Sequence, residues 1–121
     1  VIDEQCYALY AAQGHSRNDL ASYFAGGAAF ACAIYRDDVA VAACFAYPNF
    51  GRVYEIAGVY TIPAERRKGH ARQLVETALH TLALRQSIPR YQVHEENHAS
   101  IQLAEAIGLR RFVTMEHWLT L

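Results

Sequence analysis

The sequence predicts one α/β domain of the α+β type, with a mixed, mostly antiparallel sheet and helices on both of its faces. Three segments rich in aromatic and β-branched residues, at 29–35, 39–47 and 52–61, are separated only by short turn-forming clusters. This pattern is typical of an antiparallel meander. A strand, a helix and another strand then follow between residues 53 and 93. Such a unit pairs its two strands in parallel through a right-handed crossover, so the sheet is predicted to be mixed.

Size and composition agree with one globular domain. The chain has 121 residues, of which 53% are hydrophobic and 19% charged, and its formal net charge is −1. This near-neutral balance predicts neither nucleic acid nor a membrane surface as a partner, so any anion site must be local. The three cysteines show no metal-ligand spacing and predict buried free thiols in a cytoplasmic protein. The longest apolar stretch is too short to span a bilayer.

Two helices are expected before the strands. Residues 3–13 carry apolar side chains at helical spacing and end at Gly14. Ser16 is expected to cap a second helix, which ends at residues 26–27.

The turns of the meander are expected at residues 36–38 and 48–51, where turn-forming residues cluster. The third strand, 52–61, has little polar alternation, and we expect it to be central and covered on both faces.

The second half of the chain predicts two more helices and two strands. A long helix follows Pro63 with one continuous apolar stripe, formed by Ala71, Leu74, Val75, Ala78, Leu79 and Leu82. Pro89 is expected to break the chain before a short strand at 91–94. A helix over 98–107 and a last strand over 110–121 complete the prediction.

A basic segment at the start of the long helix indicates a local anion site. The helix begins at Gly69, and four cations surround it, Arg66, Arg67, Lys68 and Arg72. A helix start offers unpaired N–H groups, and its dipole favours an anion by about 0.3–1 kcal/mol per group. Because Gly69 has no side chain, a phosphate could approach the backbone closely. The alternative is a solvated basic loop before an ordinary helix.

This segment resembles the cofactor loop of the GNAT superfamily of N-acetyltransferases. The pattern Arg66-x-x-Gly69-x-Ala71 follows a predicted central strand, and Thr61-Ile62-Pro63 resembles the lead-in to that loop. The residues from Asn97 to Leu109 resemble the Asn-x-x-Ala/Ser…Gly-Phe block that closes the cofactor site. The likeness covers nearly the whole chain in element order. The spacing and length of the last block are similar to those of the glycine N-acyltransferase-like branch.

The resemblance implies an enzyme that transfers an acetyl group from acetyl-CoA to a primary amine by direct attack, without a metal. It implies one acetyltransferase-like domain over residues 1–121 with a splayed central strand pair, lacking a first strand or an upstream domain. The acceptor would be a small molecule or a peptide, and a homodimer or a longer parent chain is compatible with this reading. The implied cofactor-binding residues are Val59, Tyr60, Thr61, Arg66, Arg67, Lys68, Gly69, His70, Ala71, Arg72, Asn97 and Ser100. The first three would pair with the pantetheine arm, residues 67–72 would hold the pyrophosphate, and the last two would contact the far side of the cofactor.

Glu55 is the candidate general base. It is the only acid between residues 52 and 61, and histone-acetylating GNAT members carry their base at this place. A carboxylate acting through water could take the amine proton, and burial would raise its pKa toward that task. The alternative is a structural glutamate paired with Arg52 or another cation. The Val59 N–H could support the oxyanion.

Two other positions leave alternatives open. Gly58, inside a strand, indicates either a bulge that splays the central strands or close backbone packing. Ala104 stands where many GNAT members carry a tyrosine that protonates the leaving thiolate. Here His98 or a water would protonate the sulfur, or no acid would be needed, since a thiol pKa near 8.5 makes a tolerable leaving group.

Two other functions compete with acyl transfer in this sequence. His94-Glu95-Glu96-Asn97-His98 matches the short zinc-peptidase motif, but a strand is expected to end at His94 and a helix to start at His98, against the single helix that zinc binding needs. The other is a non-catalytic acyl-CoA-binding module, favoured by Ala104 and by the missing first strand. Aromatic residues could line an acceptor cleft or belong to the core: Tyr7, Tyr10, Tyr23, Phe24, Phe45, Tyr47 and Trp118.

Overall fold

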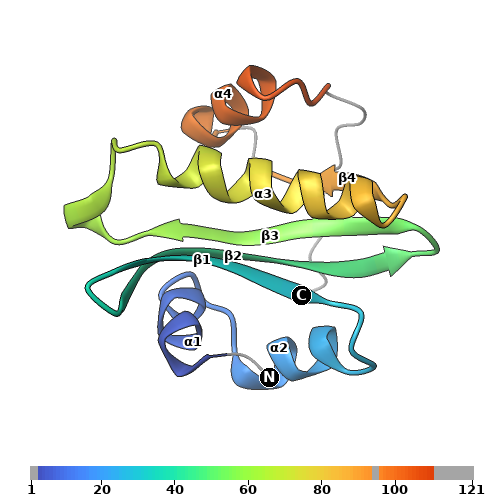
Figure 1. Ribbon diagram of the computed structural model, residues 1–121, viewed down its shortest axis with the longest axis horizontal. Helices are drawn as coiled ribbons and strands as arrows, with labels where there is room; N and C mark the ends of the chain where they lie inside the picture. Colours follow the sequence, from blue (N-terminus) through green and yellow to red (C-terminus); the bar gives the residue numbers. More distant parts are fainter. Residues whose placement is uncertain (1–2, 94–95, 111–121) are drawn as a thin grey trace, which may run out of the picture.

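The structure is a computed structural model, and it describes residues 3–93 and 96–110 (Figure 1). Within these residues a four-stranded sheet runs in the order β1-β2-β3-β4. Its strands are β1 (Phe30–Arg36), β2 (Val39–Phe50), β3 (Val53–Thr61) and β4 (Ile88–Tyr91). The first three strands are antiparallel neighbours, and β4 pairs with β3 in parallel. The predicted mixed α+β sheet is confirmed.

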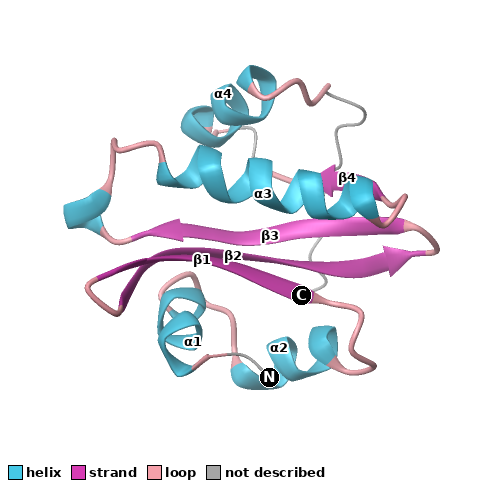
Figure 2. Ribbon diagram, viewed as in Figure 1, coloured by secondary structure: helices cyan, strands magenta, loops and turns pink. Residues whose placement is uncertain are grey.

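Helices cover both faces of this sheet (Figures 1 and 2). The helices are α1 (Glu4–Ala11), α2 (Arg17–Phe24), α3 (His70–Leu84) and α4 (His98–Ala106), with a short 3-10 turn, η1 (Pro63–Glu65). The helices α1 and α2 lie on one face, whereas α3 and α4 lie on the other. The two N-terminal helices begin at side-chain caps. Asp3 accepts the Gln5 N–H at 2.8 Å and Ser16 accepts the Asp19 N–H at 3.1 Å.

Apolar side chains fill the space between each helical layer and the sheet. On the α1 side, Tyr10, Leu20 and Phe45 are almost completely buried. On the α3 side the predicted stripe is confirmed, since its buried members pack against β2 and β3. The strand β3 contributes to both layers, with Ala57 on the α1 side and Ile56 on the α3 side. The expectation that this strand is covered on both faces is therefore confirmed.

Two proline predictions are wrong. Residues 48–51 were expected to form a turn, but β2 continues through Pro48 as far as Phe50. The pairing of β1 with β2 ends at Ala46, so at Pro48 the strand β2 has a neighbour only on its β3 side. Because no strand is paired there on the β1 side, the N–H that proline lacks is not needed for a hydrogen bond to β1. Pro89 was expected to break the chain, but it lies inside β4, which ends at Tyr91 rather than at residue 94.

The helix predicted over 98–107 is confirmed as α4, followed by Gly108 with φ of 93°. The strand expected over 110–121 lies outside the described residues beyond Arg110.

The strand β3 contains a bulge at Gly58. Ala43 of β2 pairs with Tyr60, whereas Phe45 pairs with Ala57, so β3 has one residue more than β2 over this interval. Gly58 has φ of 66°, and a Cβ there would lie 2.5 Å from Phe45 Cε1. The two readings of Gly58, a bulge and close packing, are thus both correct.

A buried hydrogen bond supports the bulge from the opposite helix. The Tyr10 hydroxyl donates to the Cys44 carbonyl at 2.7 Å, and Cys44 is the β2 residue that faces the interrupted ladder. We expect Tyr10→Phe to lower the free energy of unfolding by about 1–3 kcal/mol, because a buried carbonyl loses its donor. Urea denaturation measures this loss, with Tyr7→Phe on the same helix as control. An equal loss in both variants would contradict a specific role for the Tyr10 bond.

Candidate functional site

The pairing between β3 and β4 stops in the middle of β3, where β4 ends. They pair from Val53 and Ile88 as far as Ile56 and Tyr91, while β3 continues to Thr61. Within the described residues, β3 therefore has no neighbouring strand on this side beyond Ile56. An extended molecule could add to this open edge as a further strand.

Hydrogen bonding on the other side of β3 decides which backbone groups face the open edge. The Ile62 N–H donates to the Val41 carbonyl at 2.9 Å. Because such groups alternate in direction along an antiparallel strand, those of Tyr60 point toward β2 and those of Thr61 point away from it. The Thr61 carbonyl accepts a hydrogen bond from Arg66 Nε at 2.9 Å. Of these two candidate residues, Thr61 is the one whose backbone faces the opening.

The helix α3 begins immediately beyond this edge. Gly69 precedes it in the left-handed conformation, with φ of 82°, and has no side chain with which to cap the helix. The first intrahelical bond joins the Gln73 N–H to the Gly69 carbonyl. The N–H groups of His70, Ala71 and Arg72 therefore have no acceptor within the helix. Apart from its two chain neighbours, no described residue comes within 4 Å of a Cβ built on Gly69, so the space beside the helix start is open.

Most of the predicted cations do not point freely into this opening. Arg66 folds back onto Thr61 and over the Tyr60 ring, 5.5 Å from its centre. Arg72 pairs with Glu76 at 2.9 Å. Arg67, with φ of 66°, is exposed and has no partner among the described side chains.

Lys68 and His70 both contact Glu65, a buried carboxylate that the sequence reading missed. Lys68 Nζ lies 2.9 Å from one of its oxygens, and His70 Nε2 lies 3.1 Å from the other. Its position at the start of the basic run was the one signal that could have pointed to it.

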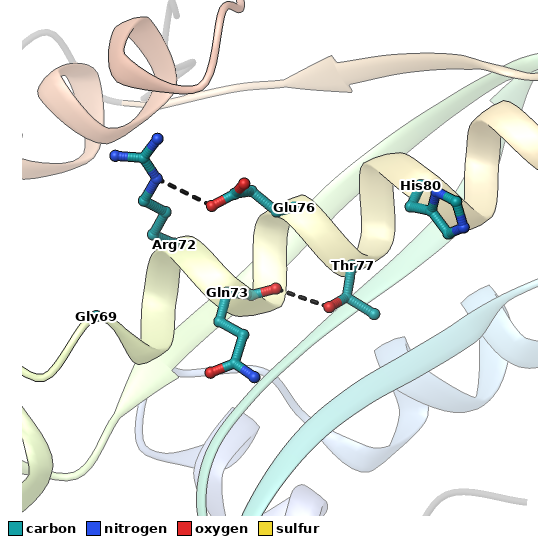
Figure 3. A pocket seen from close by; sticks show the side chains of 6 residues that line it. All are labelled: Gly69, Arg72, Gln73, Glu76, Thr77 and His80. Carbon is teal, nitrogen blue, oxygen red and sulfur yellow. Dashed lines mark hydrogen bonds and ion pairs between the residues drawn. The ribbon is translucent and has the colours of Figure 1, made fainter.

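A shallow hollow of about 390 Å³ continues from Gly69 along the outer face of α3 (Figure 3). Its side chains form the polar face of the helix: Arg72, Gln73, Glu76, Thr77 and His80. Figure 3 shows Arg72 turned toward Glu76, and Thr77 bonded to the Gln73 carbonyl. The hollow is open to solvent and adjoins the amides at the helix start.

Glu55 lies on β3 before the bulge and is only 6% exposed. Its Oε1 accepts from Asn49 Nδ2 at 3.4 Å and lies 3.4 Å from Arg90 Nε. Its Oε2 is buried and has no hydrogen-bond partner among the described residues. Burial raises the pKa of Glu55, against the opposing effects of Arg90, the Gln92 N–H and Asn49.

The expected alternative partner, Arg52, bonds instead to the Gln86 carbonyl. The cation beside Glu55 is Arg90 of the neighbouring strand, which sequence spacing did not indicate.

Two half-buried tyrosines stand next to Glu55. Tyr47 faces Glu55 directly across the β2–β3 ladder, and the Tyr23 ring stacks on Tyr47 with 4.0 Å between centres. Burial, with smaller effects of Tyr23 and Glu55, raises the pKa of Tyr47 to about 12. The aromatic residues therefore fall into two groups. Tyr10 and Phe45 belong to the core, whereas Tyr23 and Tyr47 lie beside the carboxylate of Glu55. Trp118 lies outside the described residues.

The structure places Asn97 and Ser100 at the start of α4. Asn97 Oδ1 accepts the Ser100 N–H at 3.1 Å, so Asn97 is the cap of this helix. Burial raises the pKa of Tyr91, the last residue of β4, against an opposing effect of Ser100. Ala104 lies within α4.

The zinc-peptidase alternative needs His94, which is outside the residues that the structure describes. His98 is the first residue of α4. In the described ranges, no three His, Cys, Asp or Glu side chains gather closely enough to hold a metal ion. Nor does any helix there have the length and apolarity needed to cross a membrane.

The described residues thus combine a bulged central strand, a neighbouring strand that ends halfway along it, and an uncapped helix start. The chain belongs to the acetyltransferase (GNAT) family, which matches residues 3–109. Members of this family are N-acetyltransferases that use acetyl-CoA, and this chain is therefore a GNAT acetyltransferase. The comparisons give no support to the glycine N-acyltransferase-like branch.

Solved structures show the same fold at low sequence identity. A putative GNAT acetyltransferase from Novosphingobium aromaticivorans has a TM-score of 0.73 and 22% identity; the match covers 88% of this chain and 48% of that one. A putative acetyltransferase from Agrobacterium tumefaciens has a TM-score of 0.78 and 17% identity, over 96% and 92% of the two chains. An aminoglycoside antibiotic 6'-N-acetyltransferase from Acinetobacter haemolyticus has a TM-score of 0.76 and 17% identity, over 98% and 94%. A search of the curated proteins finds no significant match.

Proposed function

We propose that this domain, residues 1–121, transfers an acetyl group from acetyl-CoA directly to a primary amine. The observation that carries the proposal is the uncapped start of α3 beside the open edge of β3. The amides offer hydrogen-bond donors to a diphosphate, and the open edge offers donors and acceptors to the amide-containing pantetheine arm. A ligand that combines both groups is coenzyme A.

The residues around this opening then take distinct parts in binding. The backbone N–H groups of residues 67–72 hold the diphosphate, and Arg67 supplies a side-chain cation. Val59 and Thr61 hydrogen-bond the pantetheine arm through their backbone groups, while Asn97 and Ser100 lie on the far side of the cofactor. Tyr60 supports the loop by lying under Arg66.

Glu55 acts as the general base in this proposal. Its buried Oε2, which has no hydrogen-bond partner among the described residues, accepts the amine proton through a water as the nitrogen attacks the thioester carbon. The Val59 N–H stabilises the carbonyl oxygen as it gains charge. The C–S bond breaks with its electron pair on sulfur, and the thiolate leaves without a dedicated acid or takes its proton from water.

The acceptor is a small molecule or peptide with a primary amine, which reaches Glu55 along the wall formed by Tyr23 and Tyr47. Similar folds include an aminoglycoside 6'-N-acetyltransferase, so aminoglycosides belong in the first panel of acceptors.

A binding module without turnover is the second candidate. Ala104 in α4 favours it because no tyrosine is there to act as the acid, and the Arg90 ion pair favours it because it gives Glu55 a structural partner.

Two measurements on the parent protein test the proposal. Calorimetry should detect binding of coenzyme A, and thiol release from acetyl-CoA should depend on an amine and be insensitive to a metal chelator. Absence of coenzyme A binding would refute the cofactor assignment. Binding without thiol release for any amine in a panel of aminoglycosides, polyamines, amino acids and peptides would favour the binding module.

A further inference from the structure

The carboxylate of Glu65 joins three parts of the chain at one end of the sheet. Glu65 is the last residue of η1 and is 8% exposed. Its Oε2 lies 2.9 Å from Lys68 Nζ in the cofactor loop. Its Oε1 lies 3.1 Å both from His70 Nε2, at the first residue of α3, and from Arg36 Nε, at the end of β1. One side chain thus connects the loop, the helix start and the β1–β2 hairpin.

The loop that Glu65 holds has a backbone that needs support. Arg67 has φ of 66°, in a region that residues other than glycine rarely adopt, and Gly69 has φ of 82°. Such conformations persist when surrounding contacts hold them. Lys68 lies between these two residues in the sequence, and its ammonium is bound to Glu65. Lys68 and His70 lower the pKa of Glu65, so the carboxylate is ionised at neutral pH.

We infer that Glu65 is a positioning residue for the cofactor loop, and this inference rests on the proposed function. By holding Lys68 and His70 against Arg36, it fixes the direction in which the amides at the start of α3 point. It also withdraws two cationic or polar side chains from the opening. The diphosphate is then bound chiefly by the backbone N–H groups and Arg67.

A simple charge argument predicts the opposite effect of removing Glu65. A negative charge close to a diphosphate repels it, and its loss alone would tighten binding. The cluster, however, already sets two formal positive charges, Arg36 and Lys68, against one negative charge. We therefore expect the loss of loop geometry to outweigh the loss of repulsion, because small misplacements of binding groups are costly.

The test compares coenzyme A with pantetheine, which shares the arm and lacks the diphosphate. In Glu65→Gln and Glu65→Asp we expect the Kd for coenzyme A to rise about 10-fold and that for pantetheine to stay within about twofold, since charge-assisted hydrogen bonds are among the strong ones. The Asp variant keeps the charge but shortens its reach, so it separates geometry from charge. At saturating acetyl-CoA, kcat should be unchanged. Glu4→Gln, which removes a carboxylate from the exposed pair with Arg17, is the matched control.

Three outcomes would overturn the inference. They are unchanged binding of coenzyme A, tighter binding, and an equal loss of affinity for both ligands, which would mean a general structural role. If the Glu65 variants fail to fold, Arg36→Gln serves as a second variant, because it removes one ion pair of Glu65 by changing an exposed side chain. We expect it to weaken the binding of coenzyme A about threefold and to leave the binding of pantetheine unchanged. If the parent protein binds no coenzyme A, the proposed function fails before this inference is tested.

Discussion

Glu55→Gln is expected to lower kcat for amine acetylation by about 10²–10⁴-fold, the usual contribution of a general base. Glutamine keeps the shape of the side chain and can still accept the Asn49 hydrogen bond, but it cannot take a proton. Coenzyme A affinity should be unchanged, because Glu55 lies on β3 before the bulge and away from the start of α3. Thiol release at saturating acetyl-CoA measures the first quantity, and calorimetry measures the second.

The pH dependence of kcat/KM provides an independent test of the same residue. Burial raises the pKa of Glu55 above the ordinary value for glutamate, and a base acts only when it is deprotonated. Activity in the parent should therefore fall as the pH is lowered through this raised pKa, and that acidic limb should be absent in the glutamine variant. Glu4→Gln should behave as the parent. Equal turnover in Glu55→Gln and the parent would show that Glu55 is a structural partner of Arg90.

The same pKa shift predicts the effect of Glu55 on stability. A raised pKa means that the folded state binds the proton more tightly than the unfolded state. The stability gained from this group is present below its unfolded pKa and is lost as the pH rises through its folded pKa. Since glutamine resembles the neutral form, Glu55→Gln should not follow this pH trend. Thermal unfolding across the acidic range would show whether the parent does.

Gly58→Ala is expected to lower the free energy of unfolding by roughly 2–5 kcal/mol. The added methyl group would lie 2.5 Å from Phe45 Cε1 and 3.3 Å from Tyr10 Cδ1, and overpacking of this kind costs about 1–3 kcal/mol. Alanine at φ of 66° adds about 1–2 kcal/mol of backbone strain. Urea denaturation measures the sum.

Gly14→Ala separates the two contributions. Gly14 has φ of 89°, and apart from its chain neighbours no described residue comes within 4 Å of its added Cβ, so this variant carries the backbone cost alone. The difference between the two variants is the packing cost at the bulge. Equal losses would mean that Phe45 moves aside at little cost, and the bulge would then not depend on a glycine for space. If Gly58→Ala folds, its coenzyme A affinity should also fall, because the open edge of β3 starts at the bulge.

Local sequence signals were sufficient to predict most of the elements. Ser16 caps its helix through Asp19, three positions away, and the stripe on α3 repeats within one helix. Gly69 marks the start of α3 because this position has a left-handed backbone conformation, which glycine adopts more readily than residues with a side chain. Each of these signals depends on interactions between close neighbours in the chain, so the sequence displays it directly.

Only the tertiary structure decided which partners each buried charge has. Whether a strand tolerates Pro48 or Pro89 depends on which of its sides is paired, and that is a property of the sheet. The partners of Glu55 are Asn49 and Arg90 on two neighbouring strands, and the ladder register brings them together.

The Glu65 cluster has the same origin. Arg36 reaches Glu65 because the β1–β2 hairpin and the loop before α3 lie at the same end of the sheet. The sequence by itself determined the order and type of the described helices and strands, the glycine of the bulge and the basic residues around the start of α3. The fold alone determined which charges around the start of α3 are held by Glu65 and which stay exposed, because an ion pair depends on distance and burial rather than on order along the chain.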